Sequence, residues 1–535
     1  MTDRALVAVL AARFVRARWG MRFRSRARFD AWQRRRIRSF LRRLPEAPFY
    51  RDIAAAADRP GRLRLLDQLP IVDKSTLLAR FDELNTHGVR LADAMSVALE
   101  GERTRDFSGV VDGDLSVGLS SGTSGRRGVF LVSPRERMLW AGTILARVLD
   151  RQTVAQVLRP WRPPVRIAFF LRAGGSLYES VASSRIRFAF FDLTRPIEAH
   201  AAVLDAAASR GQAADVVVAP ASVLAALARR SLDGGSLEGG SLDGGQLAGG
   251  SLAGGSRMSP RLVISVAEVL DPDVADLVER AWGAAPRQVY QATEGLLAIT
   301  CEHGALHLNE ESVHIEREWL DAERTRFIPV VTDFDRRTQI IARYRLDDVI
   351  RVGSAARSFS SPSSSSASVG ADAAAGSASM GAGAAPGSAD PAAGSRCERC
   401  ACGRVTEVVA GVDGRADAVL RLPSLDGRST VEVFPDVVRR AMTVASRGYS
   451  DWRIRQTGLD LHVSLDEVDT EHETEAEAAA QRETRVAAVS GAVAAEAALT
   501  ELFDAYGCHA TIVFDPWTPP EPGMKVRRIV RESTS

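Results

Sequence analysis

Short apolar runs alternate with helical patterns in the middle of the chain. The runs are rich in Val, Ile and Phe, which is typical of strands that are buried on both faces of a sheet. They occupy residues 165–171, 188–191, 214–219 and 262–265. Residues 196–209 and 220–229 have the apolar spacing of helices. This alternation predicts an α/β fold with a mainly parallel sheet covered by helices, and ligands collect at the carboxyl ends of such strands.

Both ends of the chain add to this core. Apolar residues recur at helical spacing from Leu6 to Val15, in a region rich in arginine, and we expect this helix to pack on the large domain. After residue 414, the chain has a helical stretch over 471–506 and several short strand patterns. These strand patterns lie at 452–454, 461–463 and 511–514. We therefore expect a large N-terminal domain over 1–414 and a small α+β lid over 415–535.

Two low-complexity segments interrupt this pattern. Residues 231–256 repeat a five-residue unit of the Ser-Leu-Asp-Gly-Gly type, and paired glycines at that interval defeat both helix and strand. Residues 354–395 are rich in Ser, Ala and Gly, with almost no large apolar residue to bury. We expect both segments to be flexible insertions in the N-terminal domain.

Composition narrows the function classes. With 45% hydrophobic and 25% charged residues, the chain is typical of a globular protein, and a formal net charge of +2 gives no field that attracts nucleic acid. No run approaches the ~20 apolar residues that a membrane span needs, and the N-terminal apolar run is a poor signal peptide. We expect a cytoplasmic protein without a nucleic-acid partner. The sequence indicates no oligomeric state.

A loop rich in glycine and hydroxyl residues follows the alternating run that ends at Leu119. Its backbone N–H groups and hydroxyls can approach a polyphosphate closely, although a mobile turn has the same composition. The loop residues are Ser120, Ser121, Gly122, Thr123, Ser124 and Gly125. Further motifs follow downstream, namely Tyr-Gln-Ala-Thr-Glu at 290–294, Arg-Tyr-Arg-Leu-Asp-Asp at 343–348, Gly-Arg-Ala-Asp at 414–417 and Gly-Met-Lys at 523–525.

In this order the motifs resemble those of the adenylate-forming superfamily, closest to the branch of phenylacetate–CoA ligases and coenzyme F (deazaflavin) synthetases. The resemblance runs from Phe49 to Lys525. It implies an enzyme that uses ATP and magnesium to activate a small-molecule carboxylic acid as acyl-AMP, with release of pyrophosphate. The resemblance leaves the acceptor of the acyl group open between coenzyme A, an amine and none. Two alternatives stay open: an adenylyltransferase that moves AMP to a hydroxyl of a coenzyme, and a nucleotide-binding scaffold without turnover.

The resemblance also assigns roles around the nucleotide. It implies that Tyr290 lies against adenine, that Thr293 contacts the α-phosphate, and that Glu294 holds Mg²⁺, while the loop over 120–125 holds the β- and γ-phosphates. A single glutamate beside a bound nucleotide suits magnesium, which keeps few protein ligands. The loop carries Arg126-Arg127 where many relatives have Lys-Pro.

Four further positions belong to the ribose, the lid and its motion. The resemblance implies that Asp348 accepts both ribose hydroxyls and that Arg415 lies near the ribose and phosphate. It also implies that Lys525 bridges the attacking carboxylate and the α-phosphate, and that the lid rotates about the hinge residue Asp417. Many relatives have glycine where this chain has Asp347, so two adjacent carboxylates compete, and the spacing from the motif tyrosine favours Asp348.

Three of the 5 cysteines lie close together, in a chain with no secretory signal, which favours metal over disulfides. Cys301, His303, Cys400 and Cys402 can make a tetrahedral Cys₃His zinc site with a structural role, with Cys397 as a spare ligand. Some members of the phenylacetate–CoA ligase branch are similar in carrying Cys-x-His and Cys-x-Cys-Gly at matching places. The alternative is a cluster of reduced thiols at the end of a linker.

The identity of the acid stays open between aromatic, fatty and amino acids. Tyr178 and Glu179 follow the first buried strand and are candidates for the acyl pocket, although a helix start explains them equally well.

Overall fold

The computed structural model describes most of the chain. The described residues are 3–55, 64–104, 106–119, 128–171, 184–193, 197–233, 258–353, 400–415, 418–445, 449–467, 491–519 and 527–532. Several predicted features lie outside them: the phosphate loop over 120–125, Tyr178 and Glu179, the insertion over 354–395 and nearly all of the one over 231–256, Cys397, Asp417 and Lys525.

Most helices precede the strands of the large sheet or lie between them in the sequence, and α14 and α16 follow it. They are α1 (Asp3–Val15), the π-helix η1 (Arg16–Gly20), α2 (Arg26–Leu41), the 3₁₀ turns η2 (Leu44–Glu46) and η3 (Pro48–Tyr50), α3 (Arg51–Ala55), α4 (Arg64–Gln68), α5 (Lys74–Ala79), α6 (Phe81–Leu84), α7 (Leu91–Thr104), α8 (Pro134–Val148), α9 (Arg151–Leu158), α11 (Ile197–Ser209), α12 (Ala221–Asp233), α13 (Pro272–Trp282), α14 (Pro435–Val444) and α16 (Gly491–Ala505).

The strands of the N-terminal part form two sheets. They are β1 (Val110–Val111), β2 (Leu115–Leu119), β3 (Val129–Val132), β4 (Val165–Leu171), β5 (Ile186–Asp192), β6 (Val216–Ala219), β7 (Leu262–Val266), β8 (Arg287–Ala292), β9 (Gly295–Thr300), β10 (Leu306–Leu308), β11 (Val313–Trp319), β12 (Arg326–Asp333), β13 (Tyr344–Arg345), β14 (Asp348–Val352) and β15 (Val408–Arg415). The first three form a small antiparallel sheet, and the other twelve form one large sheet.

The large sheet has a parallel half and an antiparallel half. Its strand order is β11-β12-β14-β15-β10-β9-β8-β7-β6-β4-β5, with β13 paired to β12. The strands from β5 to β8 are parallel, as the alternation of strands and helices predicts. From β8 onward every pairing is antiparallel. The sequence did not predict this second half, which contains most of the motifs assigned to the nucleotide by resemblance.

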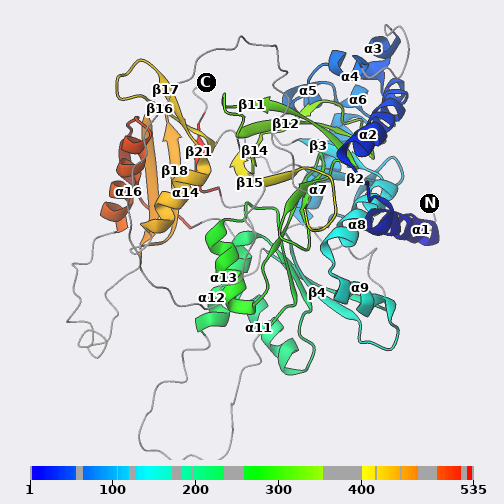
Figure 1. Ribbon diagram of the computed structural model, residues 1–535, viewed down its shortest axis with the longest axis horizontal. Helices are drawn as coiled ribbons and strands as arrows, with labels where there is room; N and C mark the ends of the chain where they lie inside the picture. Colours follow the sequence, from blue (N-terminus) through cyan, green and yellow to red (C-terminus); the bar gives the residue numbers. More distant parts are fainter. Residues whose placement is uncertain are drawn as a thin grey trace, which may run out of the picture.

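Helices cover both faces of the parallel half. On β4, Ile167 and Phe169 belong to a core cluster that includes residues of α8 and α9. The alternate residues Ala168 and Phe170 belong to another cluster that includes residues of α11, α12 and α13. Figure 1 shows these two groups of helices on either side of the strands. The expected α/β class is confirmed, because strands buried on both faces require such double cover.

The N-terminal helix packs on the large sheet domain, as its apolar spacing predicts. Helix α1 lies along α8, and the Arg13 guanidinium donates to Thr143 Oγ1 on α8 at 2.7 Å. The same side chain forms a buried ion pair with Asp335 at 2.8 Å. In the part of the chain that the structure describes, no helix combines the length and apolar character that crossing a membrane requires.

The chain after β15 builds separate sheets and a core of its own. Its strands are β16 (Leu420–Pro423), β17 (Thr430–Val433), β18 (Tyr449–Thr457), β19 (Asp460–Glu467), β20 (Thr511–Asp515) and β21 (Ile529–Arg531). They form a two-stranded sheet and a four-stranded sheet in the order β20-β19-β18-β21, and α14 and α16 pack with them (left in Figure 1). The predicted strands at 452–454, 461–463 and 511–514 are confirmed, and of the helical stretch over 471–506 the structure describes α16.

Candidate functional site

A tight hairpin presents the Thr-Glu motif. Strands β8 and β9 pair up to Ala292 and Gly295, so Thr293 and Glu294 form the two-residue corner between them. The Thr293 hydroxyl donates to Glu294 Oε2 at 3.1 Å, and Glu294 is only 6% exposed. The corner therefore holds a buried carboxylate at a fixed position.

The other motif residues come from β8, β14 and β15. Asp348 and Arg415 lie directly opposite each other in the β14–β15 pair. The Tyr290 hydroxyl donates to Asp348 Oδ2 at 2.6 Å, and Arg415 Nε lies 4.0 Å from Asp348 Oδ1. The structure thus brings together Tyr290, Asp348 and Arg415, although β9 and β10 separate β8 from β15 in the sheet.

Burial and like charge set the electrostatics of this group. Burial raises the pKa of Glu294, and nearby Asp348 adds to the rise, whereas the positive charge of Lys74 opposes it. Burial also raises the pKa of Tyr290 well above its ordinary value, with Asp348 contributing, so the phenol keeps its proton and serves as a donor. A cation beside Glu294, in addition to Lys74, would lower the free-energy cost of burying the Glu294 charge.

Lys74 is a member of this group that the sequence analysis missed. It begins α5, and its Nζ lies 3.4 Å from Asp347 Oδ2. A bridge between Val72 and Tyr344 brings the start of α5 to the site. No local pattern marks this lysine, because only the tertiary fold brings it close to Glu294.

The two adjacent carboxylates face different partners. Asp347 pairs with Lys74, whereas Asp348 accepts the Tyr290 hydroxyl and lies beside Arg415. These contacts favour Asp348 as the residue that belongs with the nucleotide motifs.

The strand that precedes the predicted phosphate loop passes beside the hairpin corner. A Cβ built on Gly118 of β2 would lie 3.7 Å from Thr293 Cγ2, and Leu119 pairs with Val129 of β3. The chain therefore enters the segment 120–127 next to the Thr-Glu corner. The predicted loop residues themselves, with Asp417 and Lys525, lie outside the described residues.

Gly295 directly follows the Thr-Glu corner and packs closely against Asp333. Replacing Gly295 with alanine should destabilise the fold. A Cβ here would lie 3.0 Å from Asp333 Oδ2, and Asp333 is fully buried with its Oδ1 held by the Asp335 backbone N–H at 2.8 Å. We expect Gly295→Ala to lower the free energy of unfolding by about 1–3 kcal/mol in urea denaturation. Gly411→Ala is the control, since its Cβ would meet nothing closer than 3.9 Å. Equal stability of the two variants would contradict this account.

A second cluster of ligand-type side chains lies at the opposite end of β9. Cys301, His307, Cys400 and Cys402 place their ligand atoms within 4.8 Å of one another. Cys301 Sγ lies 3.7 Å from Cys400 Sγ, and Cys402 Sγ lies 3.4 Å from His307 Nε2. With zinc–sulfur bonds of ~2.3 Å, two ligands of a tetrahedron lie about 3.7 Å apart, so the geometry fits zinc.

The structure places His307, not His303, in this cluster and corrects that part of the prediction. His307 pairs with Ile299 across the β9–β10 hairpin, and Cys301 lies two residues beyond Ile299, so both side chains point to one face of the hairpin. His303 lies at the tip, 46% exposed, with Nε2 3.9 Å from Glu302. The register of the hairpin decides between the two histidines.

Contacts around the cluster orient its members. Thr406 O and Oγ1 both lie 3.1 Å from His307 Nδ1, which leaves Nε2 to face the sulfurs. Cys301 and Cys400 each open a turn that closes on a glycine in the left-handed region, Gly304 with φ 78° and Gly403 with φ 75°. Hydrogen bonds from Cys402 and His307 lower the pKa of the Cys301 thiol to about 3. The Cys-x-x-Gly spacing, present twice, is the sequence signal for this arrangement.

Comparisons with known proteins bear on the fold. The sequence matches no family model and no curated protein. Two solved structures of 2-hydroxyisobutyryl-CoA ligase match it with a TM-score of 0.55, each over 96% of this chain and 91% of that chain. One is in the postadenylation state with R3-HIB-AMP and is 14% identical; the other holds 2-HIB-AMP and is 15% identical. The chain therefore has the fold of 2-hydroxyisobutyryl-CoA ligase, as the motif resemblance implied.

Proposed function

We propose that the chain is an ATP-dependent adenylate-forming ligase, which activates a carboxylic acid as acyl-AMP and releases pyrophosphate. The observation that carries this proposal is the contact of Tyr290, Asp348 and Arg415 beside the buried Glu294. Residues that the motifs assign to one nucleotide come from separate strands and meet. The fold match supports it, since both matched ligase structures hold an acyl-AMP.

In this proposal each contact has a role at the nucleotide. Tyr290 lies against adenine and holds Asp348, whose two oxygens accept the ribose hydroxyls. Arg415 supplies positive charge near the ribose and the α-phosphate, and Thr293 donates to the α-phosphate. The loop over 120–125 holds the β- and γ-phosphates, and the position of Gly118 on the preceding strand, beside Thr293, supports that role.

Magnesium belongs at Glu294. This carboxylate is buried, and its raised pKa reflects the cost of an uncompensated negative charge. A divalent cation held by Glu294 would remove that cost, and one carboxylate together with phosphate groups is a ligand set that suits Mg²⁺. The ion would neutralise charge that develops on the phosphates.

Zinc belongs in the Cys₃His cluster. The distances of 3.7 Å and 3.4 Å between ligand atoms suit tetrahedral coordination by Cys301, His307, Cys400 and Cys402. Four protein ligands leave no open position, so we assign this site a structural role. It would fasten β9 and β10 to the segment that leads into β15.

The second part of the chain acts as a lid in this proposal. Residues 418–529 contribute a separate core cluster, while the last strand of the large sheet ends at Arg415. We propose a domain boundary directly after Arg415, one residue beyond the predicted 414/415, and rotation about Asp417, which would move Lys525 to and from the α-phosphate.

The acyl acceptor is proposed to be coenzyme A. The fold matches are to a CoA ligase, and both hold an acyl-AMP, which favours a carboxylic acid over a coenzyme hydroxyl as the group that attacks ATP. The adenylyltransferase alternative is therefore not favoured.

Lys525→Ala tests the proposed chemistry. Purified protein should release pyrophosphate with one member of a panel of aromatic, fatty and amino acids. The variant should lose this activity by about two orders of magnitude, because the developing charge at the α-phosphate lacks its cation. Its ATP affinity, measured by calorimetry, should stay within about threefold, since the other nucleotide contacts remain.

Lys525→Arg is the control that keeps the charge at this position. ATP binding by wild-type protein without pyrophosphate release for any acid would overturn the proposal and favour a nucleotide-binding scaffold.

A further inference from the structure

A basic cavity lies beside the Cys₃His cluster, away from the nucleotide motifs. Its volume is about 340 Å³, and it lies between the end of α8, one face of α9, the π-helix η1 and the turn after β9. Glu294 precedes β9 and Cys301 follows it, so the length of the strand separates the two sites by roughly 20 Å. This cavity is not part of the proposed nucleotide site.

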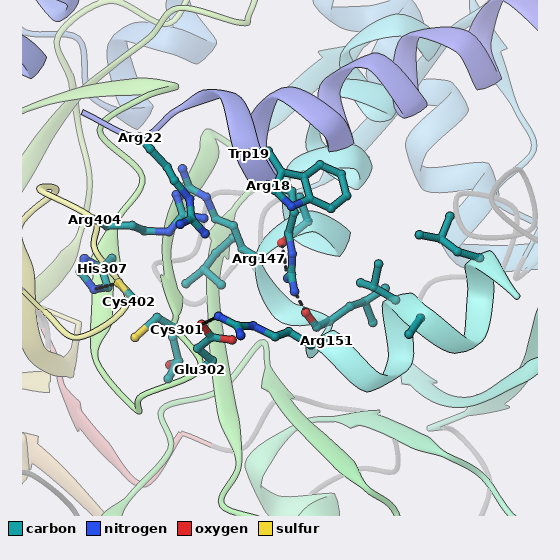
Figure 2. Close-up of a pocket in the computed structure, with 17 residues that line it drawn as sticks. Arg18, Trp19, Arg22, Arg147, Arg151, Cys301, Glu302, His307, Cys402 and Arg404 are labelled. Carbon is teal, nitrogen blue, oxygen red and sulfur yellow. Dashed lines mark hydrogen bonds and ion pairs between the residues drawn. The ribbon is translucent and has the colours of Figure 1, made fainter. Parts of the chain in front are cut away.

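Arginines dominate the polar wall of the cavity. They are Arg18, Arg22, Arg147, Arg151 and Arg404, and Glu302 is the one carboxylate among the described lining residues. Figure 2 shows the guanidinium groups of Arg22, Arg147 and Arg404 gathered at one side. Guanidinium groups at such close range repel one another unless an anion lies between them.

The protein only partly compensates this charge. Arg147 and Arg404 share Glu311, at 2.5 Å and 3.3 Å. Burial lowers the pKa of Arg147 to about 10, and the neighbouring Arg404 adds to this effect. Arg151 pairs with Glu302 only at 3.7 Å.

In the part of the chain that the structure describes, two of the guanidinium groups form no ion pair with a carboxylate. Arg18 donates to the backbone carbonyls of Ala146 and Leu149, at 2.9 Å and 2.6 Å. Within the described residues, Arg22 has neither a hydrogen bond nor an ion pair. The cavity therefore presents donors and positive charge that the chain does not use.

The remaining wall of the cavity is apolar. Trp19, on η1, is 51% exposed and lines the cavity together with Leu149, Val154 and Leu158. A cavity with convergent donors on one side and an aromatic surface on the other fits an anion that carries a flat apolar group.

We propose that this cavity binds a phosphate monoester with an aromatic or apolar body, with Arg22 and its neighbours on the phosphate and Trp19 on the body. Planar guanidinium groups suit phosphate because they donate two parallel hydrogen bonds. The cavity volume lies at the lower end of the range for small-molecule sites. This inference goes beyond the proposed ligase activity and does not depend on it.

A metal bound at the thiol cluster would offer a different explanation for the arginines. Zinc with three thiolates and a histidine carries a net charge of −1, and Cys402 and Arg404 both line the cavity. The guanidinium groups could then serve only to balance that charge. Anion binding by the metal-loaded protein separates the two accounts.

Calorimetry of the full, metal-loaded chain tests the proposal with phenyl phosphate and inorganic phosphate as probes. Arg22→Ala should raise the Kd of both by about tenfold or more, because a charge-assisted contact is lost. Trp19→Ala should raise the Kd of phenyl phosphate alone, by about threefold or more. Arg35→Ala, an exposed arginine on α2, should change neither.

Three results would overturn it. The first is that the wild type binds neither probe at millimolar concentration. This result would overturn the proposal regardless of the zinc content of Arg22→Ala. The second is unchanged binding in both Arg22→Ala and Arg151→Ala; the Arg151 side chain is 82% exposed, so we expect its removal to leave folding unchanged. The third is loss of binding in Asp348→Ala, which would place the probes in the nucleotide site.

Discussion

Glu294→Gln should lower acid-dependent pyrophosphate release by about two orders of magnitude, because an amide cannot hold Mg²⁺ as a carboxylate does. Glu294 lies in the corner between β8 and β9, where the Thr293 hydroxyl donates to it at 3.1 Å. Glutamine keeps an oxygen for that donor and fills the same volume. The loss should shrink as Mg²⁺ is raised, which a dose series of pyrophosphate release at fixed ATP would measure.

The stability of the same variant should move the other way. Burial raises the pKa of Glu294, so the folded protein holds the charged form at a cost when no metal is bound. A neutral side chain removes this cost, and the metal-free Glu294→Gln protein should melt no lower than the wild type. A lower melting temperature would point to a structural role instead.

Glu318→Gln is the matched control for the activity measurement. Glu318 lies on the edge strand β11, pairs with Arg345 and is largely exposed. Its activity should equal that of the wild type at every Mg²⁺ concentration. If Glu294→Gln also behaves like the wild type, Glu294 is not the metal ligand.

The relative positions of three of the proposed nucleotide residues follow from local spacing. Tyr290, Thr293 and Glu294 occupy one hairpin, so a short motif fixes their relative positions. Asp348 and Arg415 lie far apart in the sequence, yet they face each other because they are directly paired between β14 and β15. Because each of these two residues stands in a short motif of its own, the motifs identified both despite the long insertion between the two strands.

Other features depend on register and on distant packing. His307 replaces His303 because strand pairing, not proximity in sequence, sets which side chain shares a face with Cys301. In the antiparallel half of the sheet no local pattern identifies the pairing partners, although β9 and β12 are almost completely buried. In the sequence, the N-terminal arginines indicate the polar surface of a helix. They line a cavity only because η1 lies beside α8 and α9 in the folded chain.

Removing His307 should cost the protein its zinc and much of its stability, whereas removing His303 should cost neither. His307 Nε2 lies 3.4 Å from Cys402 Sγ, whereas His303 lies at the hairpin tip with its side chain 46% exposed. Wild type purified without a metal-binding tag should carry about one zinc per chain. We expect the same of His303→Ala, and a large loss of zinc in His307→Ala.

The stability difference follows because binding energy at a structural zinc site becomes folding energy. His307→Ala, or wild type treated with a chelator, should lose several kcal/mol of unfolding free energy in urea denaturation. Acid should release the metal as well, since thiolates and imidazole must be deprotonated to bind it. Zinc retained by His307→Ala but lost by His303→Ala would restore the assignment made from the sequence, and metal-free wild type with unchanged stability would reject the site altogether.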